Sequence, residues 1–356
     1  MREHTARLKK SYKNLIWLAV LIILAVCTIK IITSQCGGYT SEGFRRCLRS
    51  ISPVWLAAAI VFAFGFIYFE GIGLRCTCGF LGHGFGRGKA TLYSAADIYF
   101  SAITPSAAGG QPAALLLMVS DSIPTAVATI ALMLNLVMYT IAILLLGALA
   151  FILCPHMFFG YSTVAKLLVL FGTVVQLIFI ALFLMCIFKD SLIRTLARWG
   201  LKLLCKLRIL KDCDAQHEKL ERGIDEYKRC GALLKGNGRL IAQVFACNLA
   251  QRLSVISVAV CIFLGTGGRA ADAVAAFCAQ TYTVLGSNAV PIPGAVGAAD
   301  YLFIEGFKSI VPDYISLELI SRGISFYGAF IFCGVLLMLH TLCKTLSKRK
   351  IDKETS

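Results

Sequence analysis

Long runs without a single Asp, Glu, Lys or Arg constrain this chain more than any other feature. They include residues 15–29, 50–69, 122–165, 167–188, 253–268 and 323–343. A helix of about 20 apolar residues crosses the roughly 30 Å of hydrocarbon in a bilayer. The sequence is 58% hydrophobic and only 15% charged, whereas a soluble domain carries about a quarter charged residues. We therefore predict an all-α polytopic membrane protein, with residues 1–356 forming a single integral membrane domain.

The longest run is too long for one crossing, and Cys154, Pro155 and His156 interrupt it, because proline cannot continue a helix. The first run is longer than the apolar part of a signal peptide and lacks a small-residue cleavage site, so we expect it to be retained as a helix. We predict six full spans, at about residues 15–34, 53–74, 124–153, 161–188, 240–265 and 318–343.

Positive charge is concentrated in three segments, residues 1–14, 189–239 and 344–356, within a chain of net charge +16. Lys and Arg accumulate in cytoplasmic loops, and six crossings put all three segments on the same side. We therefore predict a cytoplasmic N-terminus, a cytoplasmic tail at 344–356 and a basic amphipathic segment at 189–239 on the inner leaflet. The positive charge fits anionic lipid, so a phospholipid membrane is the expected partner and nucleic acid is not.

Two further apolar segments, residues 92–120 and 272–310, are broken near their centres by proline, glycine and small polar residues. Proline and glycine interrupt a helix, so each segment divides into two half-helices. The predicted orientation is consistent only if each segment returns to the side that it entered. We predict two re-entrant hairpins, the first entering from the cytoplasm and the second from outside; the alternative is two kinked helices.

The order of these segments suggests an internal repeat with inverted topology. Residues 53–153 contain a span, a hairpin and a span, and residues 240–343 contain the same series in the opposite sense. Paired hydrophobic segments interrupted by Gly and Pro indicate a transporter site near the bilayer midplane. Irregular backbone at that depth must be buried in protein or line a wet cavity, so the two breaks predict a cavity.

The first break supplies a candidate anion site. Pro112 suits the first position of the second half-helix and Gln111 its cap, and the free N–H groups of such an end accept a phosphate or carboxylate. Charges within the membrane are costly and indicate function, although Arg252 and a carboxylate could instead form a buried structural pair. The predicted lipid-headgroup site comprises Asp97, Thr104, Pro105, Ser106, Gly109, Gly110, Gln111, Pro112, Arg252, Pro291, Pro293, Gly294, Gly297 and Asp300.

Other apparent motifs do not predict chemistry. Glu305, Lys308 and Arg322 are expected to extend to the membrane interface, and residues 75–91 to form a flexible cytoplasmic surface loop without the pattern of a phosphate loop. The 15 cysteines are dispersed and the 5 histidines lie far apart, so no metal, cofactor or catalytic residue is expected. Whether Cys36 and Cys47 form a disulfide is left open.

The strings ITPSAAGGQP (103–112) and PIPGAVGAAD (291–300) resemble the two signature segments of the lysylphosphatidylglycerol synthase transmembrane region family. This family is the membrane half of the multiple peptide resistance factor proteins, and the resemblance extends over roughly residues 12–345. It implies a bacterial inner-membrane protein that moves aminoacylated phospholipid to the outer leaflet and gives resistance to cationic peptides. The second string departs from the family pattern, which has a second glycine where Ala295 stands and a Glu where this chain has Asp300.

Three functions remain open from the sequence. The first is a flippase for phospholipid, with aminoacylated phosphatidylglycerol as the expected substrate. The second is a component of a phosphatidylglycerol lysyltransferase that acts with a separate synthase protein, and the third is a scaffold without transport. The resemblance implies a soluble synthase domain, and the longest soluble segment, 189–239, is too short to hold one, so we do not expect catalysis by this chain alone. A homo-oligomer is also left open.

Overall fold

The computed structural model describes residues 41–354 apart from 105–106, 189–224, 226–228 and 235. Over these residues it is helical and contains no strand. The predicted span at 15–34 and most of the basic segment at 189–239 lie outside the described residues. Five described helices are long and apolar enough to cross a membrane, which confirms the all-α polytopic fold: Pro53–Phe80, Thr125–Leu153, Thr163–Met185, Gly238–Gly265 and Tyr314–Lys344.

The first four of these spans correspond to single helices, α3 (Pro53–Phe80), α6 (Thr125–Leu153), α8 (Thr163–Phe188) and α11 (Gly238–Gly265). Proline marks the helix starts, as its fixed φ favours: Pro53 opens α3, and Pro155 opens the short α7 (Pro155–Gly160) that separates α6 from α8. A short helix, α2 (Ser41–Ser50), precedes α3.

The last span combines three elements in succession. Helix α14 (Tyr314–Arg322) continues through a π-helical segment, η4 (Gly323–Gly328), into α15 (Ala329–Glu354). A π-helix is rare, is usually a single turn within an α-helix and often lies at a functional site. Here it lies immediately after Arg322, at the end of α14 that faces the second hairpin.

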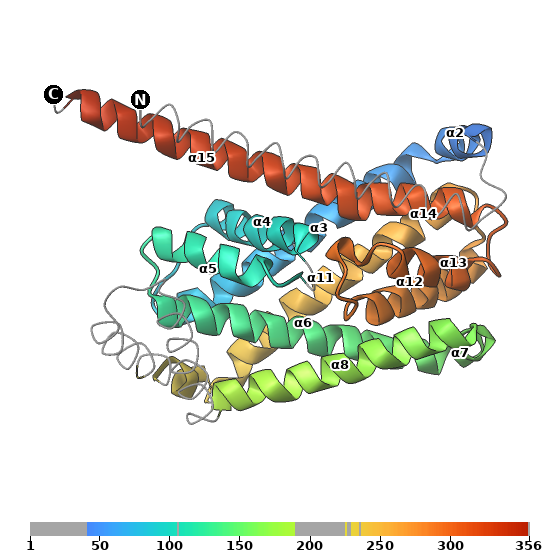
Figure 1. Ribbon diagram of the computed structural model, residues 1–356, viewed down its shortest axis with the longest axis horizontal. Helices are drawn as coiled ribbons and strands as arrows, with labels where there is room; N and C mark the ends of the chain where they lie inside the picture. The colour runs from blue at the N-terminus through green and yellow to red at the C-terminus, as the bar shows by residue number, and fades with distance from the viewer. Residues whose placement is uncertain (1–40, 105–106, 189–224, 226–228, 235, 355–356) are drawn as a thin grey trace.

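Both broken segments form helix pairs with short non-helical tips. The first pair is α4 (Arg87–Ile103) and α5 (Gly110–Ser120). The second pair is α12 (Ala273–Ser287) and α13 (Ala298–Phe307). Short 3₁₀ turns precede both helices of the second pair: η2 (Ala270–Asp272) lies before α12, and η3 (Pro293–Ala295) lies before α13. Figure 1 shows that the two pairs open toward opposite ends of the bundle and that their tips point toward its middle.

The two halves of the chain run in opposite senses. In the first half α3 is followed by the α4–α5 hairpin and α6, and in the second α11 is followed by the α12–α13 hairpin and α14. The backbone N–H of Ser52 donates to the carbonyl of Gly265 at 2.9 Å. This bond joins the start of α3 to the end of α11, so the two helices, which pack along each other, are antiparallel.

The predicted loop at 75–91 is mostly helical, and the prediction was wrong for its two ends. Helix α3 continues to Phe80 and α4 begins at Arg87, so only residues 81–86 lie between them. The reason is burial: Leu74, Thr77 and Cys78 pack inside the bundle, and a buried segment must pair its backbone groups internally.

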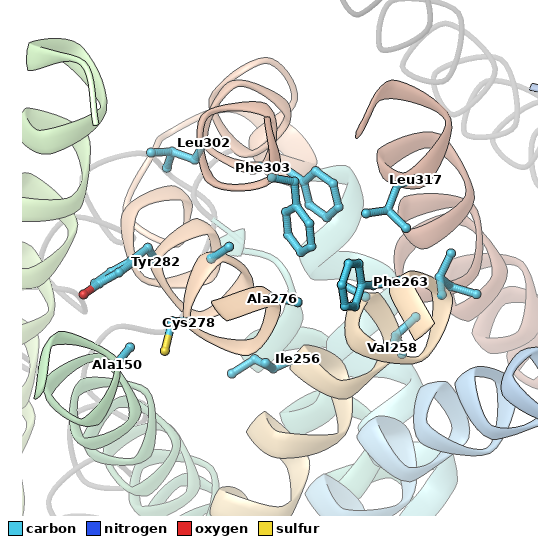
Figure 2. Packing of buried hydrophobic residues seen from close by; sticks show 14 of the residues in the cluster. Ala150, Ile256, Val258, Phe263, Ala276, Cys278, Tyr282, Leu302, Phe303 and Leu317 are labelled. Atoms are coloured by element: carbon cyan, nitrogen blue, oxygen red, sulfur yellow. The ribbon is translucent and has the colours of Figure 1, made fainter. Parts of the chain in front are cut away.

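The second hairpin lies in the main apolar core. Figure 2 shows α12 among α6, α11, α13 and α14, with Cys278 and Tyr282 on α12 and Phe263 on α11 directed into the packing. On the outer surface, α8 and α15 expose apolar side chains, and such a surface suits contact with lipid. These include Val164, Leu167, Leu170, Phe171, Val174, Leu177, Ile331, Val335, Met338 and Leu339.

Candidate functional site

A cavity of about 520 Å³ lies between the tips of the two hairpins. Both halves of the chain contribute to its walls, which come from α3, α4, α5, α6, α8, α11, α12, α13, the η3 turn and the segment from α14 through η4 into α15. Most of the lining is apolar, which is usual for a small-molecule site with a few placed polar groups. Among the described residues, the charged side chains in the lining are Glu70, Asp97, Arg252, Glu318 and Arg322.

The first charged cluster surrounds Asp97 on α4. Ser101 Oγ lies 3.1 Å from Asp97 Oδ1, and Gln111 Nε2 donates to Asp97 Oδ2 at 2.7 Å. On the facing helices, Gln251 Nε2 donates to Glu70 Oε2 at 2.8 Å. All of these groups are buried or half-buried. Burial removes water from the two carboxylates, and the hydrogen bonds from these neutral donors partly replace the lost hydration.

Arg252 on α11 completes this cluster through aromatic contacts. Its guanidinium carbon lies 4.4 Å from the ring centroid of Tyr139 and 5.7 Å from that of Phe66. Arginine stacks well on aromatic faces because its charge is planar and weakly hydrated. The side chain is therefore held in place while part of its hydrogen-bonding capacity stays free, since Nε is buried and has no partner in the described ranges.

The second charged cluster surrounds Arg322 at the end of α14. Its Nη1 lies 2.5 Å from Asp300 Oδ1 on α13, and its Nη2 donates to the carbonyl of Gly294 at 2.7 Å. Glu318, one helical turn earlier, lies 3.9 Å from the same Nη1. The ring of Phe326 lies 5.4 Å from the guanidinium carbon, so this arginine, like Arg252, combines buried carboxylates with an aromatic face.

The tip of the first hairpin depends on two adjacent glycines. A Cβ on Gly110 would lie 2.1 Å from Asp97 Oδ1, and one on Gly109 would lie 2.6 Å from Thr104 Cγ2. Thr104 Oγ1 donates to the carbonyl of Phe100 at 2.7 Å and accepts from the N–H of Gly109 at 2.9 Å. These contacts close the end of α4 against the start of α5.

The structure changes the roles predicted for Gln111 and Pro112. Helix α5 begins at Gly110, so Gln111 and Pro112 are its second and third residues rather than its cap and first residue. The carboxylate of Asp97 lies beside this helix start, where the helix dipole favours negative charge. Asp97 thus lies beside the helix start that the sequence assigned to a lipid anion.

The tip of the second hairpin is held by left-handed backbone. Gly294 and Gly297 have φ of 61° and 87°, and Ala295 between them has φ of 49°. Pro293 opens the η3 turn. The N–H of Gly297 donates to Asp300 Oδ2 at 2.8 Å, so Asp300 both caps α13 and pairs with Arg322.

Of the predicted site residues, Asp97, Gln111, Arg252 and Gly294 line the cavity. The others that are described belong to the two hairpins but are not in the cavity lining, and Pro105 and Ser106 lie outside the described residues. These residues are Thr104, Gly109, Gly110, Pro112, Pro291, Pro293, Gly297 and Asp300.

Three charged cavity residues, Glu70, Glu318 and Arg322, were not in the predicted site. Arg322 is buried and ion-paired, so its predicted position at the interface was wrong, whereas Glu305 and Lys308 pair with each other at the end of α13. The i, i+4 spacing of Glu318 and Arg322 on one helix face was the available signal.

Several buried polar atoms around the cavity have no hydrogen-bond partner within the described part of the chain. They are Gln251 Oε1, Arg252 Nε, Gln280 Oε1, Glu318 Oε2, Ser321 Oγ and Arg322 Nε. A buried polar group left unpaired costs about 1–3 kcal/mol, so a cavity that collects six of them fits a polar ligand or water. Within the same described residues, no group of three His, Cys, Asp or Glu is arranged to hold a metal.

The comparisons with known proteins give one match. A family model described as "Lysylphosphatidylglycerol synthase TM region" matches residues 14–333. No curated protein and no solved structure matches the chain.

Proposed function

Since this chain belongs to the lysylphosphatidylglycerol synthase TM region family, we propose that it carries phospholipid headgroups across the bacterial inner membrane. It is a multi-pass membrane protein related to lysylphosphatidylglycerol synthesis. The proposed substrate is aminoacylated phosphatidylglycerol, the proposed site is the cavity between the hairpin tips, and both termini are proposed to face the cytoplasm.

The observation that carries this proposal is the presence of both signs of charge in the cavity. The headgroup of an aminoacylated phospholipid has a phosphate and at least one ammonium group. Arg252 and Arg322 offer guanidinium groups, which suit phosphate geometry, and Glu70 and Glu318 offer carboxylates for the ammonium. Each arginine rests on an aromatic ring, which fixes its position before the headgroup arrives.

A route from the lipid phase supports a lipid rather than a water-soluble substrate. Phe179 on α8 lines the cavity. It is also 47% exposed and is one of the large apolar residues on the protein surface. Ile292, at the second tip, is likewise both exposed and in the lining. A headgroup could enter between these walls while its acyl chains stay in the hydrocarbon.

The inverted hairpins supply a mechanism for crossing. Each opens toward a different end of the bundle, and movement of one repeat against the other exposes a midplane site to each side in turn. In this account the charged clusters hold the headgroup while one hairpin closes and the other opens.

The test is translocation of fluorescent phospholipids in liposomes that contain the purified chain. Lysylphosphatidylglycerol, phosphatidylglycerol and a neutral phospholipid are compared in wild type, Arg252→Gln and Arg322→Gln. A hydrogen bond to a charged group contributes about 1.5–3 kcal/mol, so each variant should slow headgroup-dependent translocation about tenfold or more. The matched control is Arg269→Gln, because the Arg269 side chain is 81% exposed outside the cavity.

The wild type should accelerate the aminoacylated lipid most. Equal rates for all lipids with no effect of either cavity variant would contradict binding in the cavity. No acceleration in folded, monodisperse protein would contradict transport and favour the scaffold or the component that acts with a separate synthase protein.

A further inference from the structure

Each of the two charged clusters at the cavity contains two carboxylates and one arginine. Glu70 and Asp97 accompany Arg252, and Asp300 and Glu318 accompany Arg322. All of these side chains are buried, with Asp300 and Glu318 only 1% and 2% exposed. If every group were ionised, each cluster would hold one uncompensated negative charge, and burying such a charge is costly.

The two carboxylates of each cluster also lie close together. Asp300 Oδ1 and Glu318 Oε1 both approach Arg322 Nη1, at 2.5 and 3.9 Å. Glu70 and Asp97 interact with each other beside Arg252 in the cavity wall. Ionised carboxylates only accept hydrogen bonds, so two that face each other repel unless one of them carries a proton. A single shared proton turns the repulsive contact into a hydrogen bond and gives the cluster a formal charge of zero.

The surrounding donors do not remove the need for this proton. Ser101 and Gln111 reach the two oxygens of Asp97, and Gln251 reaches Glu70 Oε2. These donors are neutral, so they leave the extra negative charge of the first pair uncompensated. In the second pair, Glu318 belongs to the cavity lining, and its Oε2 is buried without a hydrogen-bond partner among the residues that the structure describes. An unpaired carboxylate oxygen in a closed site is satisfied by gaining a proton or by contact with a cation.

Within the described helices, few other titratable groups face these pairs. Around Glu70 they are Tyr139 from α6 and Cys333 from α15, in addition to Arg252. Around Glu318 the facing charge is Arg322 on its own helix, while Cys47 on the adjacent α2 lies beside Asp313 instead.

We propose that Glu70–Asp97 and Asp300–Glu318 are two proton-binding sites, each holding one proton while the cavity contains no cationic headgroup. The second half of the proposal rests on the proposed function: an ammonium group that enters either site takes over the role of the proton. The carboxyl O–H bond then breaks, the proton passes to water, and the carboxylate pairs with the ammonium. The substrate class that this exchange requires is an amine-bearing phospholipid, with the proton as its counter-ion.

The test begins without substrate. The purified chain in nanodiscs of phosphatidylcholine is studied by infrared difference spectroscopy at neutral pH, where a protonated carboxyl gives a C=O stretching band that a carboxylate lacks. Glu70→Gln and Glu318→Gln should each remove one such band, whereas Glu70→Asp should shift its band and keep it. Glu305→Gln is the control, because Glu305 pairs with Lys308 outside the cavity, and it should leave both bands unchanged.

The exchange is tested by adding a short-chain lysylphosphatidylglycerol to weakly buffered nanodiscs with a pH indicator. It should release about one proton per site, and short-chain phosphatidylglycerol, which has no amine, should release none. Absence of both bands in the wild type would overturn the proton sites, and bands that persist without proton release would overturn the exchange. Bands in a chain that fails to translocate lipid would overturn the proposed function alone and support the proton sites.

Discussion

At the residue scale, Ala295 occupies backbone that suits glycine. Its φ of 49° lies in the left-handed region, which costs an L-residue about 1–2 kcal/mol. Ala295→Gly should therefore raise the stability of the chain by about 0.5–1 kcal/mol after the larger chain entropy of glycine is subtracted. The measurement is the melting temperature in detergent.

The control for Ala295 is Ala289→Gly, because Ala289 precedes the same tip and has no positive φ. It should lower the melting temperature slightly, since glycine only adds freedom to the unfolded chain there. If Ala295→Gly also lowers the melting temperature, the left-handed backbone at Ala295 is not strained.

A second glycine position depends on space rather than on φ. Gly110→Ala would bring its Cβ to 2.1 Å from Asp97 Oδ1 and 2.5 Å from the Asp97 carbonyl, so we expect a loss of about 1–3 kcal/mol from overpacking. Gly88→Ala is the matched control, because it lies in α4 with open space around its Cβ position and alanine favours a helix. Equal melting temperatures for the two variants would contradict the close contact of α4 and α5.

At the element scale, Asp121 ties the first hairpin to α15. In the turn between α5 and α6 it accepts from Tyr93 Oη at 3.0 Å and pairs with Lys89 and Lys344, each at 3.3 Å. Burial acts to raise the pKa of Asp121, but the hydrogen bonds from Tyr93 and the two lysines outweigh it and lower the pKa. This tether is therefore strongest when Asp121 is ionised.

The lowered pKa predicts the pH range in which the tether is lost. Its contribution is fully present above the unfolded-state pKa of about 3.9 and disappears as the pH falls through the lower folded-state pKa. Both lysines are about half exposed, so the contribution is below about 1 kcal/mol. Asp121→Asn should lower the melting temperature at pH 7 and flatten its decline below pH 4. The control is Asp272→Asn, which should leave the decline of the melting temperature below pH 4 as it is in the wild type. If Asp121→Asn shows that same decline, the tether at Asp121 is contradicted.

The helices and their breaks were predictable because their signals are local. Charge-free runs marked the described spans, and Pro112, Pro291 and Pro293 with their neighbouring glycines marked the two tips. The partners of the charged residues were not predictable from the sequence, because these contacts depend on how distant helices pack. Arg322 meets Asp300 only because α14 lies against α13, and Asp97 meets Gln111 only because the first hairpin folds back on itself.

At the scale of the whole molecule, the fold predicts which loops share a side of the membrane. Gly84 and Ser120 lie at the open end of the first hairpin, and Ala270 and Ser309 lie at that of the second. In a chain whose native cysteines are replaced, single cysteines at 84 and 120 should react with a membrane-impermeant maleimide only from the cytoplasmic side. Cysteines at 270 and 309 should react only from outside. Reaction of the two ends of one hairpin from opposite sides would contradict a re-entrant hairpin.

Transport by this chain requires a phospholipid headgroup to occupy the cavity between the two tips. Cross-linking in liposomes tests this with a lysylphosphatidylglycerol that carries a photoreactive headgroup, followed by mass spectrometry of the labelled peptides. We expect cross-links to cavity residues such as Tyr139, Gln111 and Phe326, and fewer of them in Arg252→Gln. Cross-links confined to the outward face of α15, at Val335, Met338 and Leu339, would contradict it.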